Sequence, residues 1–257
     1  MSENNLEKKF IEFVEIVRRL RRECPWDREQ THQSLRRCLL EESYEVLEAI
    51  DNNNMTELKK ELGDLLLQFV FHTVMAEESN TFTAEEVMDD EINKLIARHP
   101  HVFGDTKVSG SEEVKTNWEK LKKKEGRESV LHGIPKELPA LFRAFRVQEK
   151  AAKVGFDWKT EAPVYEKIIE EINELKQNIN SHEDKEKIED EFGDVLFSIV
   201  NYARFLKINP EDALRRTIEK FISRFEKIEQ YAKENNLNIE KMTLEEMDKI
   251  WEAAKKK

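Results

Sequence analysis

The sequence has 257 residues, 39% of them hydrophobic and 38% charged, and a formal net charge of −11. This composition supplies enough apolar residues for a core under a highly charged surface, and the length allows one large domain or two of ordinary size. The negative charge disfavours nonspecific binding to nucleic acid or to an anionic membrane, so we expect neither as a partner.

We expect a cytoplasmic protein. No apolar run is long enough to span a bilayer, and the chain opens with an amphipathic pattern rather than a secretory signal. Its two cysteines, Cys24 and Cys38, are therefore expected to be reduced thiols. A zinc site that combines them with His32 is the alternative to buried free thiols.

The first half of the chain is predicted to be helical almost throughout. Apolar residues from Leu6 to Leu20 recur with the three- and four-residue spacing of one helical face, and Pro25 ends this helix. Two more helices are expected at about 30–50 and 56–79. The second contains the run LLLQFVFHTVM, which is apolar on all sides, so we expect it to be buried in the core.

Capping signals mark the other helices of the first half. Thr83 and Glu86 form a capping-box pattern for a helix that reaches about Arg98. The turn HPHVFGD follows it, and Ser111 is expected to cap another helix that carries Trp118.

A segment with glycine and proline separates the two halves. Residues 126–138, GRESVLHGIPKEL, hold two of the seven glycines. Glycine and proline interrupt helices, so we expect this segment to be a linker between domains at 1–125 and 139–257.

The second half is also predicted to be helical, and no segment shows the alternation of a strand. A helix at about 139–153 is followed by the turn VGFDW. Asn209 and Pro210 supply an N-cap and a first-turn proline for a helix that ends near residue 235. A last capping-box pattern begins at Thr243. The sequence therefore predicts an all-α fold.

Paired carboxylates lie between these helices. Glu171 and Glu174 are three residues apart, as are Glu191 and Asp194, so each pair shares one face of a helix. The polar stretch at 178–181 reads as a break. Two antiparallel helices joined there would bring the four carboxylates face to face.

Four crowded carboxylates repel one another and need positive charge nearby. All-oxygen ligation suits Mg²⁺, with Mn²⁺ as a possible substitute. For a single pair, a solvated acidic face is the ordinary alternative. Here Phe192, Val195, Leu196 and Phe197 make the second helix apolar nearly all round, so we expect burial, where unpaired charge is costly. The pattern therefore favours a metal site.

The acidic pattern recurs in the first half at a shift of about 130 residues, together with the basic and aromatic residues that follow it. The first-half residues are Glu41, Glu42, Glu45, Glu61, Asp64, Lys94, Arg98, Trp118 and Lys122. Their second-half counterparts are Glu170, Glu171, Glu174, Glu191, Asp194, Lys220, Arg224, Trp251 and Lys255. Four of them, Glu42, Glu45, Glu61 and Asp64, are thus a possible second metal site. One polar residue differs, because Asn201 has Phe71 as its counterpart.

The doubled pattern, EExxE followed by ExxD, resembles the MazG-type nucleoside triphosphate pyrophosphohydrolases. CPWDREQTHQSL, HPHVFGD and VGFDW are also similar to stretches of the two-domain bacterial members, and the resemblance covers essentially the whole chain. The family implies tandem all-helical bundle domains, usually a homodimer, and Mg²⁺-dependent hydrolysis of NTPs or dNTPs to the monophosphate and pyrophosphate. It also implies that the second half does the chemistry, with the first half a degenerate or regulatory copy.

The resemblance gives the acidic residues their roles. Metal ions held by Glu171, Glu174, Glu191 and Asp194 would clamp phosphate oxygens and lower the pKa of a bound water. Glu170, Glu171 and Glu174 are the candidate catalytic residues, with Glu170 as an outer-shell group or base. Plain surface exposure is the alternative for Glu170.

The resemblance, together with the spacing of the basic residues, implies nucleotide contacts on the acidic hairpin and on the last two helices. The expected contact residues are Lys167, Glu170, Glu171, Lys187, Asp190, Asp194, Asn201, Lys220, Arg224, Trp251 and Lys255. Of these, Lys187, Asp190, Trp251 and Lys255 rest on the resemblance. Lys220 and Arg224 share a face and suit the phosphates, and Trp251 would stack on the base. Several have a plain alternative. It is an exposed helix stripe for Lys220 and Arg224, and an ordinary ion pair for Lys167. It is a core aromatic for Trp251, a frayed helix end for Lys255 and a hydrogen-bonded core amide for Asn201.

Other functional classes fit the pattern less well. A di-iron carboxylate bundle would use Glu-x-x-His pairs, which neither acidic motif contains. A non-hydrolytic module that senses nucleotides or docks a partner, and a purely structural helical dimer, are the remaining alternatives. The preferred nucleotide is not encoded in any pattern that we recognise.

Overall fold

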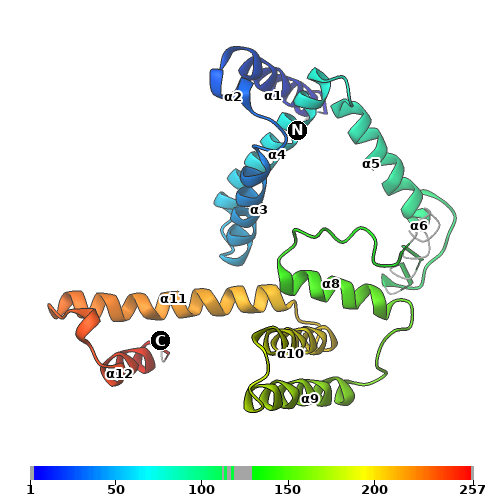
Figure 1. Ribbon diagram of the computed structural model, residues 1–257. Helices are drawn as coiled ribbons and strands as arrows, with labels where there is room; N and C mark the ends of the chain where they lie inside the picture. Colours follow the sequence, from blue (N-terminus) through cyan, green and yellow to red (C-terminus); the bar gives the residue numbers. More distant parts are fainter. Residues whose placement is uncertain (1–2, 112, 115–116, 119–128, 256–257) are drawn as a thin grey trace. The chain divides into compact units, whose positions relative to one another are not determined.

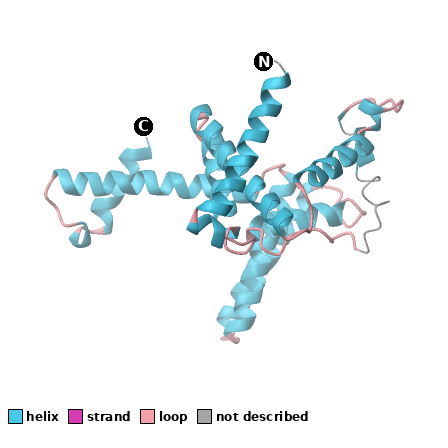
Figure 2. Cartoon of the chain, turned by 90° about the horizontal axis from the view of Figure 1, so that it is seen from above, coloured by secondary structure: helices cyan, strands magenta, loops and turns pink. Residues whose placement is uncertain are grey.

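The computed structural model describes residues 3–111, 113–114, 117–118 and 129–255, and the statements below concern these residues. Within them every regular element is a helix, which confirms the predicted all-α fold (Figures 1 and 2). The chain divides into two compact units, Met1–Lys123 and Lys124–Lys257, and each is described by itself. The domain limits drawn from the sequence, with their linker, stay a prediction.

The first unit is built from a helical hairpin and the helices around it. The helices are α1 (Glu3–Glu23), α2 (Pro25–Glu29), α3 (Arg36–Asp51), α4 (Met55–Glu78), α5 (Ala84–Arg98) and α6 (Pro100–Phe103). Helices α3 and α4 form the hairpin, and α1 packs on α4. Lys122 and much of the helix expected after Ser111 lie outside the described residues.

Side-chain caps set the ends of these helices. The Asn54 carboxamide accepts hydrogen bonds from the backbone N–H groups of Thr56 and Glu57 and thereby starts α4. The capping box of Thr83 and Glu86 is confirmed. Helix α3 begins later than predicted, because residues 32–35 form turns that are held by reciprocal hydrogen bonds between Thr31 and Ser34.

The core of the first unit lies where α1, α4 and the start of α3 meet. Its buried apolar residues are Val14, Val17, Leu35, Val70, Phe71, Val74 and Met75. Most of them come from the apolar run of α4, as the sequence predicts. The other end of the α3–α4 hairpin extends beyond this core, and its residues are correspondingly more exposed.

The second unit contains the equivalent hairpin and a long helix. Its elements are α8 (Ala140–Ala152), α9 (Glu161–Asn180), α10 (Lys185–Phe205), α11 (Pro210–Glu234), η1 (Ile239–Lys241) and α12 (Leu244–Lys255). Helices α9 and α10 form the closest packed pair, α8 packs on α10 and α11, and α12 folds back on α11 (Figure 1). Asn209 caps α11 and Pro210 stands in its first turn, as predicted.

The prediction that α10 is buried on all sides is wrong for a single copy of the chain. Phe192 is 56% exposed, and Leu196, Phe197 and Ile199 are also exposed. The reason is that α9 and α8 cover only part of the surface of α10. Leu62 and Leu66 on α4 are left uncovered in the same way.

None of the described helices combines the length and the apolar character that a membrane-crossing helix needs.

Candidate functional site

Three carboxylates meet between α9 and α10 in the second unit. Glu171 on α9, and Glu191 and Asp194 on α10, each place one oxygen within 4.8 Å of the others. Glu171 is buried because it shares a helical face with Val164 and Ile168, the other buried residues of α9. A carboxylate held at such a position is costly unless positive charge reaches it.

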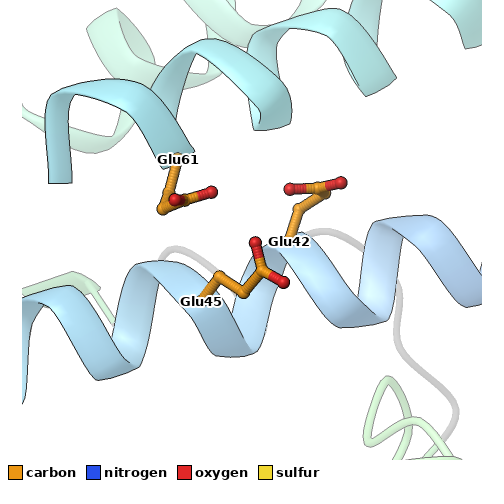
Figure 3. A group of neighbouring side chains, drawn as sticks. All are labelled: Glu42, Glu45 and Glu61. Carbon is orange, nitrogen blue, oxygen red and sulfur yellow. The ribbon is translucent and has the colours of Figure 1, made fainter. Parts of the chain in front are cut away.

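A similar group lies between α3 and α4 in the first unit. Glu42 and Glu45 on α3 reach towards Glu61 on α4, and an oxygen of each lies within 4.8 Å of the others (Figure 3). Glu61 is the most buried of the three, with 4% of its surface exposed. Acidic residues three positions apart share one face of a helix. Each half of the chain therefore forms an acidic cluster, as the sequence repeat predicts.

The fourth member of each predicted quartet stands beside its cluster. Glu174 and Asp64 are not among the groups whose oxygens meet. Desolvation and repulsion from Glu171 nevertheless raise the pKa of Glu174 above its ordinary value. Desolvation, followed by repulsion from Asp64, raises the pKa of Glu42 in the same way. Glu174 and Asp64 therefore each repel a carboxylate of the neighbouring cluster.

Each cluster also contacts one lysine. Lys167 Nζ lies 2.6 Å from Glu170 Oε1 and 2.7 Å from Glu171 Oε1, and these hydrogen bonds raise the pKa of the lysine. Lys60 Nζ lies 3.0 Å from Glu61 Oε1, and this bond lowers the pKa of Glu61. The lysines supply part of the positive charge that the carboxylates need.

The donor set fits a hard divalent cation. Glu45 and Glu61 are so close that a hydrogen bond to Glu61 raises the pKa of Glu45. Glu61 Oε2 is buried and has no hydrogen-bond partner among the described residues. Oxygen ligands with an unpaired buried acceptor suit Mg²⁺ or Mn²⁺ better than softer metals.

Asn201 is buried and belongs to a polar network rather than pointing to an open site. Its Oδ1 accepts hydrogen bonds from Arg204 Nε at 3.1 Å and Nη2 at 2.8 Å. Arg204 Nη1 donates in turn to Asp157 at 2.8 Å. Sequence reasoning missed Arg204 and Asp157. The spacing of Asn201 and Arg204, three residues apart on a helix, was the one signal available for this pair.

The basic and aromatic candidates gather on α11 and α12. The Arg224 guanidinium lies 5.5 Å from the ring centroid of Trp251, and the Phe221 ring lies 5.0 Å from the same ring. Lys220 is exposed on the same helix, and Lys255 pairs with Glu252. Among the described residues, no hydrogen bond or ion pair connects this group to the carboxylates of α9 and α10.

The first unit repeats this arrangement. The Arg98 guanidinium lies 5.6 Å from the centroid of Trp118, and His99 packs edge-on against the same indole at 4.9 Å. The sequence repeat therefore preserves a contact between a cation and an aromatic ring as well as the acidic cluster.

The remaining candidates have local partners. Lys187 is exposed and donates to Glu183, and Asp190 is exposed beside Glu191. The alternative zinc site does not form among the described residues: Cys24 and Cys38 are free and belong to no metal-binding group.

Comparison with known proteins agrees with this geometry. A family model described as the MazG nucleotide pyrophosphohydrolase domain matches residues 30–103 and 159–228, one segment in each half. The nucleoside triphosphate pyrophosphohydrolase/pyrophosphatase MazG of Thermotoga maritima is 47% identical over 96% of this chain and 95% of its own length. The nucleoside triphosphate pyrophosphohydrolase of Escherichia coli K12 is 41% identical over 94% of this chain and 95% of its own. The uncharacterised Bacillus subtilis protein YabN is 45% identical over 98% of this chain, but over 53% of its own length. The chain therefore belongs to the MazG family of nucleotide pyrophosphohydrolases.

Proposed function

We propose that this protein is a Mg²⁺-dependent nucleoside triphosphate pyrophosphohydrolase. It converts NTPs or dNTPs to the nucleoside monophosphate and pyrophosphate, through attack of water on the α phosphate. The observation that carries the proposal is the meeting of Glu171, Glu191 and Asp194 in a partly buried all-oxygen group. The names of the Thermotoga maritima and Escherichia coli relatives support the same chemistry.

The second-unit carboxylates hold the ion. Glu171, Glu191 and Asp194 supply oxygens that already converge, and Glu174 completes the set from its neighbouring position. When bound, Mg²⁺ supplies charge neutralisation on the triphosphate and polarises the attacking water. We assign the role of proton acceptor to Glu170, which is exposed and next to Glu171 in the sequence. Mn²⁺ is a suitable replacement for Mg²⁺ in such an oxygen site.

The basic residues attract the phosphates. Lys167 bridges Glu170 and Glu171, so a cation at the carboxylates would release its ammonium group towards the substrate. Arg224 and Lys220 suit phosphate oxygens, and Trp251 presents an aromatic ring next to Arg224. The family resemblance adds Lys255, Lys187 and Asp190 to the residues that contact the nucleotide. Asn201, which belongs to the network with Arg204, is also included.

A homodimer is part of the proposal. The apolar residues Leu214, Ile218, Phe221 and Ile222 follow the three- and four-residue spacing of one face of α11, and all are exposed. Helix α10 carries further exposed apolar residues. Apolar area of this extent is normally covered in a soluble assembly. A second copy would cover it and bring further groups to the carboxylates.

We place the hydrolytic step in the second unit. The first unit keeps its acidic cluster and its Arg98–Trp118 contact, so it can bind a metal ion or a nucleotide. It lacks a counterpart of the Asn201–Arg204 network, because Phe71 and Val74 occupy those positions in the core. We therefore assign it a regulatory or structural role. The cytosol, where nucleoside triphosphates are abundant, is the proposed location.

The test is pyrophosphate release from a panel of NTPs and dNTPs with Mg²⁺. We would compare the wild type with Glu171→Gln, its first-unit match Glu42→Gln, and the exposed control Glu166→Gln. Loss of a metal ligand should lower kcat by about 100-fold or more in Glu171→Gln, with little change in the other two. Loss in Glu42→Gln alone would move the chemistry to the first unit. Nucleotide binding without any pyrophosphate would favour a nucleotide sensor.

A further inference from the structure

The two helical hairpins can be aligned residue by residue at their turns. Asn53 and His182 both adopt the left-handed conformation, with φ of 52° and 53°. The N–H of Asn54 donates to the carbonyl of Ala49 at 2.9 Å, and the N–H of Glu183 donates to the carbonyl of Asn178 at 3.1 Å. Ala49 and Asn178 therefore occupy the same position in the last turn of the first helix.

In the second unit this position holds a hydrogen-bond donor. Asn178 Nδ2 donates to Glu191 Oε1 across the hairpin, over a distance of 3.1 Å. Asn178 lies one turn after Glu174 and two turns after Glu171, on the face of α9 that carries the carboxylates. The amide is neutral, so it fixes the orientation of the Glu191 carboxylate without cancelling its charge.

In the first unit the same position is occupied by Ala49, whose side chain carries no polar atom. Ala49 is buried and lines a polar cavity of about 390 Å³ together with Glu45, Lys60 and Glu61. Glu61, the counterpart of Glu191, has a buried Oε2 for which the described part of the chain offers no hydrogen-bond partner. Its Oε1 is held by Lys60, whereas Asp190 is the residue before Glu191 in the second unit.

We propose that Asn178 is a positioning residue that holds Glu191 as a metal ligand, and that its replacement by Ala49 makes the first-unit site the weaker of two divalent-cation sites. The inference rests on the proposed metal-binding role of the two clusters. An outer hydrogen bond restricts the rotation of a ligand carboxylate, and less freedom is then lost when the ion binds. In the first unit no side-chain amide among the described residues donates to Glu61. Its partners there are the Glu45 carboxyl group and the Lys60 ammonium, which competes with the ion for Glu61.

The proposal is tested with Mn²⁺ alone, by calorimetric titration of the full-length chain. Glu42→Gln leaves only the second-unit site, and Glu171→Gln leaves only the first. In the Glu42→Gln background, Asn178→Ala should weaken Mn²⁺ binding about 10- to 100-fold, the usual effect of removing an outer hydrogen bond. Asn173→Ala, at an exposed position of the same helix, is the matched control and should leave the affinity unchanged.

The reciprocal change separates positioning from simple structural damage. In the Glu171→Gln background, Ala49→Asn should tighten Mn²⁺ binding, since the cavity beside Ala49 admits the carboxamide. Thermal unfolding without metal checks that each variant is folded. Unchanged affinities in both Asn178→Ala and Ala49→Asn would overturn the proposal.

The same titration distinguishes this inference from the proposed function. Mn²⁺ binding that responds to Asn178→Ala, in a protein that releases no pyrophosphate, would support the positioning role and reject the hydrolase. A wild type that binds no Mn²⁺ would overturn the metal site and the positioning role together.

Discussion

At the residue scale, the candidate site is a balance between crowded carboxylates and a few positive groups. Lys167 pairs with Glu170 and Glu171, whereas no described residue forms an ion pair with Glu174. Desolvation and repulsion from Glu171 raise the pKa of Glu174. A raised pKa means that the folded protein prefers the protonated form of this carboxyl group. The ionised form, which is present at neutral pH, therefore lowers the stability of the folded protein unless a bound cation compensates its charge.

Glu174→Gln should separate stability from function. The folded pKa of Glu174 exceeds its unfolded value, so its unfavourable contribution appears as the pH rises above about 4.5 and is complete above the folded pKa. At pH 7.5 the neutral glutamine should raise the melting temperature of the metal-free protein, and reduce both the stabilisation by Mg²⁺ and kcat, the latter by about 10- to 100-fold. Calorimetry with and without Mg²⁺ measures the first two effects. A lower metal-free melting temperature would contradict the argument, and Glu166→Gln is the control.

At the element scale, the two hairpins are closed by different side-chain pairs at equivalent positions. In the second unit, the Tyr202 hydroxyl donates to Glu161 Oε1 at 2.7 Å. In the first unit, His32 and His72 stand at these positions with their Nδ1 atoms 2.8 Å apart. Their ring planes differ by 6° and their centroids are 5.1 Å apart. Since each nitrogen lies on the rim of its ring, the rings must lie edge to edge, with one proton between them.

This histidine pair should make the first unit sensitive to pH. Desolvation and the neighbouring His32 lower the pKa of His72 below 6.5. Its contribution to stability is therefore present above pH 6.5 and is lost as the pH falls, because the unfolded chain then binds a proton more readily than the partly buried His72 ring does. The protection of residues 30–35 against hydrogen exchange, expressed relative to the intrinsic exchange rate at each pH, should be lower at pH 5.5 than at pH 7.5.

A double variant provides the control for this prediction. His32→Glu with His72→Tyr copies the pair of the second unit, which contains no histidine. It should remove the additional pH dependence. Equal protection of residues 30–35 at both pH values in the wild type would show that the histidine pair does not hold this segment.

At the scale of the whole molecule, the exposed apolar faces are the main feature that one chain leaves unexplained. Helices α10 and α11 carry large apolar residues at helical spacing. Those on α10 are each 41–56% exposed. An isolated soluble protein rarely leaves such faces uncovered. Two carboxylates of the second-unit cluster, Glu191 and Asp194, lie on α10. Oligomer formation and activity should therefore be linked.

Leu196→Glu combined with Ile199→Glu tests that link. The wild type should be a dimer by light scattering after size exclusion, and the charged variant should be a monomer, because buried unpaired carboxylates are costly. Pyrophosphate release should fall together with dimer content. Lys185→Glu, at an exposed polar position of the same helix, should remain dimeric and active. A monomeric wild type would contradict the proposed homodimer.

Much of the fold was accessible from local sequence patterns. The caps at Asn209 and Thr83 and the all-helical character depend on residues within one or two turns of each other. The carboxylate pairs were accessible for the same reason, since a spacing of three residues fixes a common face before any tertiary contact forms. The break expected at 178–181 comes later than predicted, because α9 continues through Asn178 to Asn180.

The sequence by itself therefore determined that this is an all-α protein with two acidic hairpins of the MazG type. Only the tertiary structure decided that Glu61 is buried while Glu174 stands outside its cluster, that Asn201 binds Arg204, and that Asn178 reaches Glu191 where Ala49 cannot reach Glu61. These contacts join residues on different helices or depend on how deeply a side chain is packed. They are set by the packing of whole helices, which no short-range pattern in a single sequence records.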